Sequence, residues 1–290
     1  MMPSANWLLI FLFGYVYGQT NDSGLQTMPY GWDVSGEYFA SVWDSKVKGT
    51  YTAKGDKAGT YSFQWQDVDD AIVAKGFITG KTDRVLSYDG TFEVQENGAY
   101  LSLYGWSVGS HCVEYYVTDN WGEYAPCGPG PDDVKGTFES DGDLYTFCTT
   151  PGGQGCIDGK GESHVQFFSC RHTKRSSGTI TFANHVAAWE NAGMILGELD
   201  SYQVIAVEAY AGSSGSATIN VSEGNSTGAV LSGQKNTNGN ETTEHNTNQT
   251  ISNNKKGGDN KTPHHKKNNH KKPHRHRHHR HHYNQLESEE

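Results

Sequence analysis

Two strand-like stretches decide the fold and the chemistry expected of this chain. Residues 111–117 read His-Cys-Val-Glu-Tyr-Tyr-Val, and residues 204–210 read Val-Ile-Ala-Val-Glu-Ala-Tyr. Each stretch places one carboxylate, Glu114 or Glu208, among apolar and aromatic neighbours. Apolar surroundings solvate charge poorly, so an ionised carboxylate is costly there unless it faces water or has a function.

Strand alternation gives each glutamate two neighbours on its own face of the sheet. These neighbours are Cys112 and Tyr116 for Glu114, and Ala206 and Tyr210 for Glu208. Two carboxylates flanked by aromatic rings, on strands that face each other, suit the cleavage of a glycosidic bond. The alternative is that each glutamate lies on a solvated sheet face.

The spacing of the strand-like runs predicts an all-β fold, an antiparallel β-sandwich or jelly roll. Between residues 31 and 221, short alternating runs rich in Tyr, Thr, Val, Phe and Trp are separated by clusters of Gly, Asp, Ser and Asn. One helical stretch interrupts them. Asn184 is a good N-cap, and apolar residues recur at helical spacing from Val186 to Met194, before Gly197. We therefore expect a single helix in a β domain.

The N-terminal residues are typical of a secretory signal peptide. Residues 7–17 form an apolar run too short to span a membrane, and Gly18 is the small residue before Gln19. We expect residues 1–18 to be removed, residues 19–30 to form a linker, and the mature protein to be secreted, extracellular and free of the membrane. Asn-X-Ser/Thr triplets, which agree with export and glycosylation, begin at Asn21, Asn220, Asn225, Asn240, Asn248 and Asn260.

Five cysteines in an exported chain predict up to two disulfides and one leftover thiol. They are Cys112, Cys127, Cys148, Cys156 and Cys170. Cys148 and Cys156 bracket the turn-rich stretch Thr-Thr-Pro-Gly-Gly-Gln-Gly, so a bridge between them would staple a hairpin. Spacing alone leaves the pairing open.

The composition changes abruptly after about Ser222, and residues 223–290 are expected to form a disordered tail. Ten of the 23 Lys and Arg residues lie from Lys255 onward, so the part before it carries 13 basic against 29 acidic groups, a formal charge of −16. Nine histidines lie between His264 and His282. This tract could bind divalent metal, adhere to acidic polymers, or be a dispensable solvated tail.

Several separated motifs, in the right order, resemble glycoside hydrolase family 11, the small endo-1,4-β-xylanases. The matching stretches are residues 99–106, 113–117, 175–181, 184–189, 193–197, 202–208 and 213–217. The resemblance covers roughly residues 36–222, and we expect residues 31–222 to form the catalytic domain. It implies a β-jelly roll of two curved antiparallel sheets with a single helix beneath and a cleft across one concave face.

The resemblance implies that Glu114 is the nucleophile and Glu208 the general acid/base of a retaining endo-1,4-β-xylanase. That mechanism needs the two carboxyl groups about 5–5.5 Å apart. The charge on Glu114 would raise the pKa of Glu208 and keep it protonated for its role as acid. The expected substrate is xylan or a related plant cell-wall polysaccharide. We expect a monomer with no cofactor, no metal in the catalytic domain and no nucleic-acid partner.

Five further residues match cleft positions of the family. Trp43 matches the tryptophan on which a xylose ring stacks, and the others are Tyr104, Tyr116, Gln166 and Tyr202. The two matching tyrosines Tyr104 and Tyr116 would hydrogen-bond the sugar and the nucleophile. Without the surrounding motifs, ordinary packing within the sheet would explain these aromatic residues.

Asp70 resembles the residue, Asn or Asp, that the family carries beside the acid/base, and the aspartate form accompanies an acidic working pH. A proton shared between Asp70 and Glu208 would require the pair to hold one proton while Glu114 is ionised, which shifts the optimum toward low pH. The alternative is that Asp70 belongs to a solvated acidic turn with Asp67 and Asp69.

The hairpin that covers the cleft in the family departs from its usual sequence here. Pro151 replaces the usual arginine, Gly155 the proline at the tip, and Cys156 the serine. Glycines would loosen this hairpin, whereas a Cys148–Cys156 bridge would tighten it. A second function therefore stays open: a catalytically weak carbohydrate-binding or matrix protein on a xylanase scaffold, anchored by its tail.

Overall fold

The computed structural model describes residues 24–46, 48–128 and 132–224 of the 290-residue chain. Its fold is built on three long strands, β5 (Thr60–Phe77), β6 (Val85–Ser107) and β12 (Gln203–Glu223). β12 lies between the other two and pairs antiparallel with both. All three runs are rich in β-branched and aromatic residues, which fit a pleated, buried surface.

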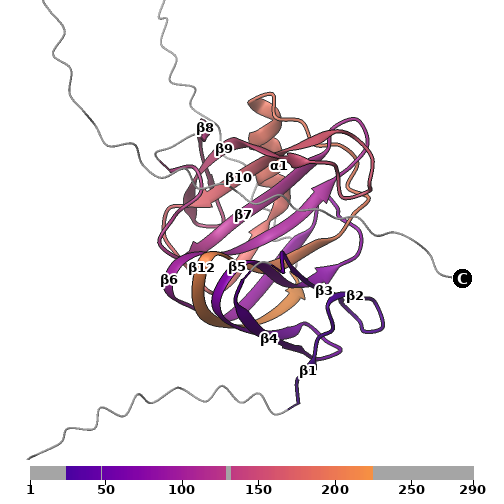
Figure 1. The fold of residues 1–290 in the computed structure, drawn as a ribbon. Coiled ribbons are helices and arrows are strands. Elements are labelled where there is room, and N and C mark those ends of the chain that lie inside the picture. The colour runs from indigo at the N-terminus through magenta and orange to yellow at the C-terminus, as the bar shows by residue number, and fades with distance from the viewer. Residues whose placement is uncertain (1–23, 47, 129–131, 225–290) are drawn as a thin grey trace, which may run out of the picture. The chain divides into compact units, whose positions relative to one another are not determined.

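The other strands extend the sheet on both sides of these three. Hydrogen-bonded neighbours follow the order β1-β4-β5-β12-β6-β7-β10-β9-β8, while β3 pairs with β2 and β5, and β11 pairs with β6 (Figure 1). The β7–β10 pair is parallel. The bounds are β1 (Gln26–Thr27), β2 (Gly31–Asp33), β3 (Phe39–Asp44), β4 (Thr50–Gly55), β7 (Val113–Trp121), β8 (Asp133–Ser140), β9 (Asp143–Gln154), β10 (Ser163–Arg171) and β11 (Gly178–Thr181).

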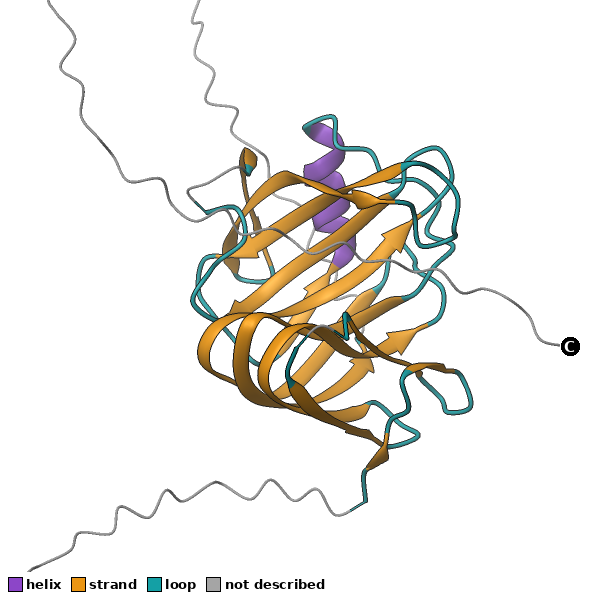
Figure 2. Cartoon of the chain, viewed as in Figure 1, coloured by secondary structure: helices purple, strands orange, loops and turns teal. Residues whose placement is uncertain are grey.

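The strands bend, and one helix accompanies them in the described part of the chain (Figure 2). The all-β jelly roll with a single helix that the sequence predicts is therefore confirmed. Hydrogen bonding runs through the strands as one continuous 12-stranded sheet, because the long strands pass through the bend. The layers of the jelly roll are thus two parts of a single sheet.

Alternation along the strands separates the core from a second, aromatic face. On β12, Ile205 and Val207 belong to the large buried cluster, whereas Val204 and Ala206 belong to a smaller one. Successive residues of a strand point to opposite faces, so one strand serves both clusters. The buried aromatic residues of the smaller cluster are Phe39, Trp43, Tyr100, Tyr104, Trp106, Tyr116 and Phe168.

The helix α1 (Phe182–Asn191) packs against the large core through Phe182, Val186 and Trp189. The ring of Trp189 lies 6.3 Å from that of Tyr115 on β7 and 5.8 Å from that of Phe167 on β10, measured between centroids. The helix therefore lies beneath these two strands, on the face opposite the aromatic cluster.

The N-cap predicted at Asn184 is wrong, because the helix begins three residues earlier with Thr181 as its N-cap. The Thr181 hydroxyl does not cap the helix, since it donates to Asp141 Oδ1 (2.7 Å). Asn184 instead donates to the Ser140 hydroxyl (3.0 Å). At the other end the helix stops at Asn191, and Gly193 has a φ of +75°, a conformation that glycine adopts readily.

Several predictions about the ends of the chain concern residues outside the described ones. These are the signal peptide, residues 1–18, and nearly all of the tail, residues 223–290. Within residues 19–30, the strand β1 pairs with β4.

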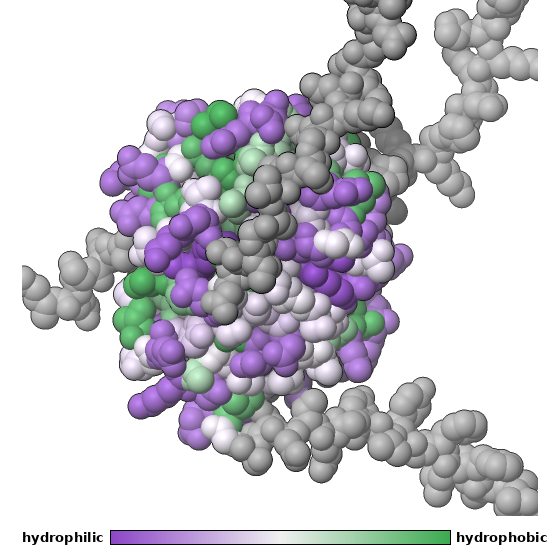
Figure 3. Space-filling view, turned by 180° about the vertical axis from the view of Figure 1, so that it is seen from behind, coloured by the Kyte–Doolittle hydropathy of each residue, from purple (hydrophilic) through white to green (hydrophobic). Residues whose placement is uncertain are grey.

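In the described part of the chain, no helix is long and apolar enough to cross a membrane. The face in Figure 3 is mainly hydrophilic, with apolar residues in small separate groups.

Two disulfides link the described chain, Cys112–Cys156 and Cys127–Cys148, and Cys170 is a buried free thiol. The predicted count of two bridges and one thiol is confirmed, but the bridge suggested between Cys148 and Cys156 is wrong. Pairing across the sheet brings the start of β7 beside the loop that follows β9. The loop between β9 and β10 is therefore tied to β7, not to its own hairpin.

We expect peptide mapping without reduction to recover the Cys112–Cys156 and Cys127–Cys148 pairs. The Cys112→Ala/Cys156→Ala double variant should lose about 2–4 kcal/mol of unfolding free energy in urea, because its bridge closes a long loop in the unfolded chain. Cys170→Ala is the control, since it removes a buried thiol and no bridge. A peptide containing linked Cys148 and Cys156 would contradict this pairing.

Candidate active site

Glu114, on β7, is completely buried and accepts three hydrogen bonds. The hydroxyls of Tyr104 and Tyr116 donate to its Oε1 at 2.8 and 3.0 Å, and Gln166 Nε2 donates to its Oε2 at 2.7 Å. Strand register explains this convergence. Tyr104 pairs with Tyr116 across β6 and β7, and Gln166 pairs with Glu114 across β10 and β7. Donors to a charged carboxylate offset much of the cost of its burial.

The donors around Glu114 are themselves held in place. Trp106 Nε1 donates to the Tyr104 hydroxyl (2.8 Å), which leaves the tyrosine proton free to point at Glu114. Burial, followed by the charge of Glu114, raises the pKa of Tyr104 and of Tyr116 well above the usual value. Both phenols therefore stay protonated donors at every working pH.

Glu208, on β12, is also buried, and its environment favours the protonated form. Burial, the charge of Asp70 and the charge of Glu114 raise the pKa of Glu208 well above its usual value, while a hydrogen bond with Tyr116 opposes them. Tyr116 therefore contacts both glutamates. A carboxylate stabilised by donors and a carboxyl group that retains its proton can act as a nucleophile and an acid.

Asp70, on β5, is buried, with 5% of its surface exposed. In the β5–β12 register it lies opposite Tyr210, and Ile72 lies opposite Glu208. Asp70 is thus a diagonal neighbour of Glu208 on the same face of the sheet. This placement argues against a solvated acidic turn, and the charge of Asp70 acts directly on Glu208.

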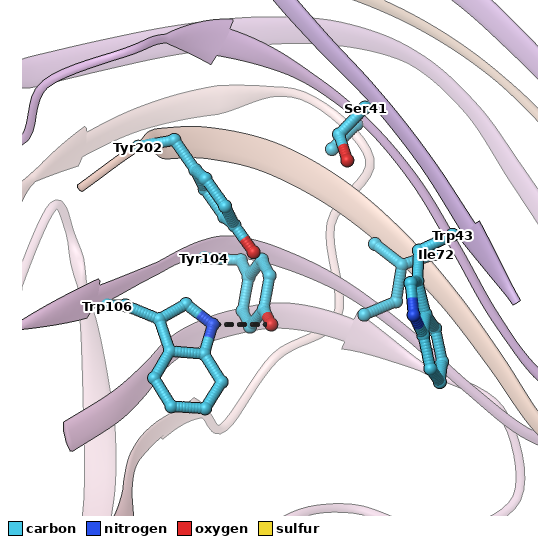
Figure 4. A pocket seen from close by; sticks show the side chains of 7 residues that line it. Ser41, Trp43, Ile72, Tyr104, Trp106 and Tyr202 are labelled. Atoms are coloured by element: carbon cyan, nitrogen blue, oxygen red, sulfur yellow. Dashed lines mark hydrogen bonds between the residues drawn. The ribbon is translucent and has the colours of Figure 1, made fainter. Parts of the chain in front are cut away.

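A cleft lies beside these carboxyl groups, lined by Ser41, Trp43, Ile72, Ala74, Tyr104, Trp106 and Tyr202. Figure 4 shows Trp43 and Ile72 on one side, with Tyr202, Tyr104 and Trp106 facing them. Tyr202 is stacked on Phe39 with ring centroids 5.2 Å apart. Aromatic walls of this kind present flat apolar faces to a sugar ring.

The structure brings together all the residues predicted from the sequence. Glu114, Tyr104, Tyr116 and Gln166 are in direct contact, Asp70 acts on Glu208, and Trp43 and Tyr202 line the adjoining cleft. No group of three or more His, Cys, Asp or Glu side chains that could hold a metal ion occurs among the described residues.

Sequence reasoning missed two residues at this site. Trp106 supports Tyr104, and His164 places its Nε2 3.4 Å from Glu114 Oε2. Both could have been found by alternation, since Trp106 is two residues after Tyr104 and His164 two residues before Gln166. Residues two apart on a strand share a face.

The chain belongs to the Glycosyl hydrolases family 11, whose family model matches residues 35–220. It is 39% identical to Endo-1,4-beta-xylanase 3 of Pyricularia oryzae over 185 residues, 63% of this chain and 76% of the relative. It is 36% identical to Endo-1,4-beta-xylanase B of Phanerodontia chrysosporium over 236 residues, 80% of this chain and 76% of that relative.

A solved structure with the same fold comes from a structural comparison of two major endo-1,4-beta-xylanases from Trichodrema reesei. It is similar to this chain with a TM-score of 0.55 and 32% sequence identity, over 68% of this chain and 99% of that chain. The part of the present chain that matches corresponds to nearly the whole of that molecule.

We expect Tyr104→Phe to lower kcat/KM for glycoside hydrolysis about 10-fold or more, because a hydrogen bond to a charged group contributes about 1.5–3 kcal/mol. The measurement is the rate of reducing-end release from polysaccharide, together with a thermal melt. Tyr51→Phe is a matched control, since the Tyr51 hydroxyl also donates to a carboxylate, Asp44 Oδ2 (2.7 Å), away from Glu114. Equal activity in the two variants would contradict the importance of the Tyr104 donor.

Proposed function

We propose that this protein is an endo-1,4-β-xylanase that cleaves internal bonds of xylan with retention, through a glycosyl-enzyme intermediate. Family membership supports the reaction class, and the named relatives support the substrate. One observation carries the mechanism. Glu114 is buried with three donors on its carboxylate, in the same site as Glu208, whose pKa is raised.

In the first step, protonated Glu208 donates its proton to the glycosidic oxygen as the bond to the anomeric carbon breaks. One oxygen of the Glu114 carboxylate forms a new bond to that carbon, so a covalent glycosyl ester results. The hydrogen bonds from Tyr104, Tyr116 and Gln166 orient the carboxylate toward the sugar.

In the second step, the roles of the two groups follow from their charges. Formation of the ester removes the negative charge of Glu114, which is one cause of the raised pKa of Glu208. Glu208, now ionised, takes a proton from water as the water oxygen attacks the anomeric carbon. Glu114 leaves as a carboxylate and Glu208 regains its proton, which restores the starting state.

The aromatic residues of the cleft bind the polysaccharide substrate. Trp43 lies where a xylose ring can stack on its indole, and Tyr202 faces it across the cleft beside Tyr104 (Figure 4). Stacking on aromatic faces tolerates a repeating sugar chain, because each ring presents the same apolar face. A cleft lined by aromatic rings therefore suits the binding of a polysaccharide chain.

Asp70 supports an acidic working pH. The charge of Asp70 acts directly on Glu208, so the two carboxyl groups titrate as a pair. At low pH the pair holds one shared proton while Glu114 stays ionised, and this proton passes to the leaving oxygen. The proton-sharing pair is then most active on the acidic side.

The proposal extends to export and to the tail, both of which rest on sequence alone. The apolar run at residues 7–17 supports secretion into the extracellular space. In the tail, residues 223–290, neutral imidazoles bind divalent metals and gain charge below about pH 6.5, which supports binding of metal or of acidic polymers.

The decisive variant is Glu114→Gln, which keeps the shape of the side chain but removes the attacking charge. We expect reducing-end release from xylan to fall at least about 1000-fold, about 4 kcal/mol, between pH 3 and 8. Glu93→Gln, at an exposed position on β6, is the matched control and should keep wild-type activity. Polysaccharide binding without turnover in the wild-type chain would instead favour the carbohydrate-binding alternative.

The role of Asp70 is tested by Asp70→Asn. Asparagine cannot take up or share a proton, so the requirement for a proton shared between residue 70 and Glu208 disappears. We expect the optimum of kcat/KM to move upward by about one pH unit, the equivalent of about 1.4 kcal/mol. Asp67→Asn, at an exposed position of the same strand, should leave the pH profile unchanged. An optimum that stays in place or moves downward would refute the proton-sharing pair.

A further inference from the structure

His164 lies where the β9–β10 hairpin meets Glu114. It is the second residue of β10, at an irregularity in the pairing with β9 between Ser163 and Val165. Its side chain is only 2% exposed. The ring packs edge-on against Trp106, with centroids 4.7 Å apart.

Both nitrogens of His164 make polar contacts, and together they reach three groups. Nδ1 lies 2.9 Å from the Gly155 carbonyl, to which it donates. Nε2 lies 3.0 Å from the backbone N–H of Gly153 and 3.4 Å from Glu114 Oε2. The first two groups belong to the hairpin end, and the third is the buried carboxylate.

The hairpin is shaped to receive this ring. A Cβ at Gly152 would lie 2.3 Å from His164 Cδ2 and 2.6 Å from its Nε2, closer than real atoms approach, so only glycine fits there. Beyond the ring, the Cys112–Cys156 disulfide fixes the loop after Gly155 to the start of β7. The hairpin end is thus held both by a covalent bridge and by His164.

The Nε2 atom of His164 cannot accept a hydrogen bond from the N–H of Gly153 and donate one to Glu114 Oε2 at the same time. In the neutral ring, with the proton on Nδ1, the Nε2 lone pair accepts the N–H of Gly153. In the protonated ring, Nε2 carries a hydrogen and donates to Glu114 Oε2, so the N–H of Gly153 loses its acceptor. Protonation therefore moves one hydrogen bond from the hairpin to the carboxylate.

The surroundings decide which state is populated. Glu114, on β7, is the charged group that acts on His164, while β6 presents Trp106 and β9 presents backbone groups. Burial by itself lowers the pKa of His164, but the hydrogen bond and charge of Glu114, with the Gly155 carbonyl, outweigh it and raise the pKa above 6.5. At acidic pH the ring is therefore an imidazolium that faces the carboxylate.

We propose that His164 is a positioning residue that joins Glu114 to the hairpin end, stabilising the ionised carboxylate at acidic pH and binding the N–H of Gly153 at higher pH. The consequence for catalysis rests on the proposed role of Glu114 as nucleophile. A cation next to this carboxylate keeps it ionised at a pH where it would otherwise take up a proton.

The first test does not depend on catalysis. The full chain is labelled uniformly with ¹⁵N and titrated by NMR, and the His164 signals are assigned by their loss in His164→Gln. We expect a His164 midpoint above 6.5, a drop below 6.5 in Glu114→Gln, and a Gly153 amide shift that follows the His164 midpoint. The exposed His172, which contacts Thr146, is the internal control, and its signals should not differ between the variants. A His164 midpoint below 6.5 that Glu114→Gln leaves unchanged would overturn the proposal.

The second test is the pH profile of kcat/KM for His164→Gln. Neutral glutamine can still accept the N–H of Gly153 but cannot supply charge. We expect a loss of about threefold or more below the His164 midpoint and nearly wild-type values above it, because charge-assisted hydrogen bonds are lost only at low pH. A purely structural role would lower activity equally at all pH values and would overturn the proposal. Should the chain fail to hydrolyse xylan at all, the NMR titration still decides the role of His164.

Discussion

The burial of a single carboxylate is the constraint on which the rest of this site depends. Glu114 has no exposed surface, and an unpaired charge in such a place would cost several kcal/mol. Tyr104, Tyr116 and Gln166 offset that cost, and they come from β6, β7 and β10. Because the three donors belong to separate strands, they meet only when those strands pair in the observed register. The stability of the buried Glu114 carboxylate therefore depends on the strand order and register of the sheet.

The same alternation that builds the core also builds the site. On β7, Tyr115 faces the helix and the core, whereas Glu114 and Tyr116 face the cleft. A slip of one residue would exchange these faces and place the carboxylate in the apolar core. The long strands β5, β6 and β12 resist such a slip because each has one face packed into the large core along most of its length. Core packing thus fixes the positions of groups that contribute nothing to the core themselves.

Electrostatic asymmetry between the two glutamates follows from their neighbours. Glu114 is surrounded by donors, whereas Glu208 is buried next to two other carboxyl groups, those of Asp70 and Glu114. The first environment favours charge and the second favours the proton. His164 adds a titratable group that contacts both Glu114 and the hairpin end, so the acidic groups and the hairpin end share one network. Two departures of the hairpin from the usual family sequence take part in these contacts, because the Gly155 carbonyl accepts a hydrogen bond from His164 and Cys156 is bonded to Cys112.

The sequence by itself determined the β class, the existence of one helix, and the two glutamates with their aromatic neighbours, because alternation and motif order are local properties. It could also have indicated His164, two residues before Gln166. Only the tertiary structure decided the partner of Cys156, which is 44 residues away in Cys112, and the true N-cap, since the Asn184 side chain binds Ser140 instead. It also decided that Asp70 lies diagonal to Glu208, through the pairing of β5 with β12. These features depend on which segments, far apart in the sequence, become neighbours in the fold. A local sequence pattern does not specify such contacts.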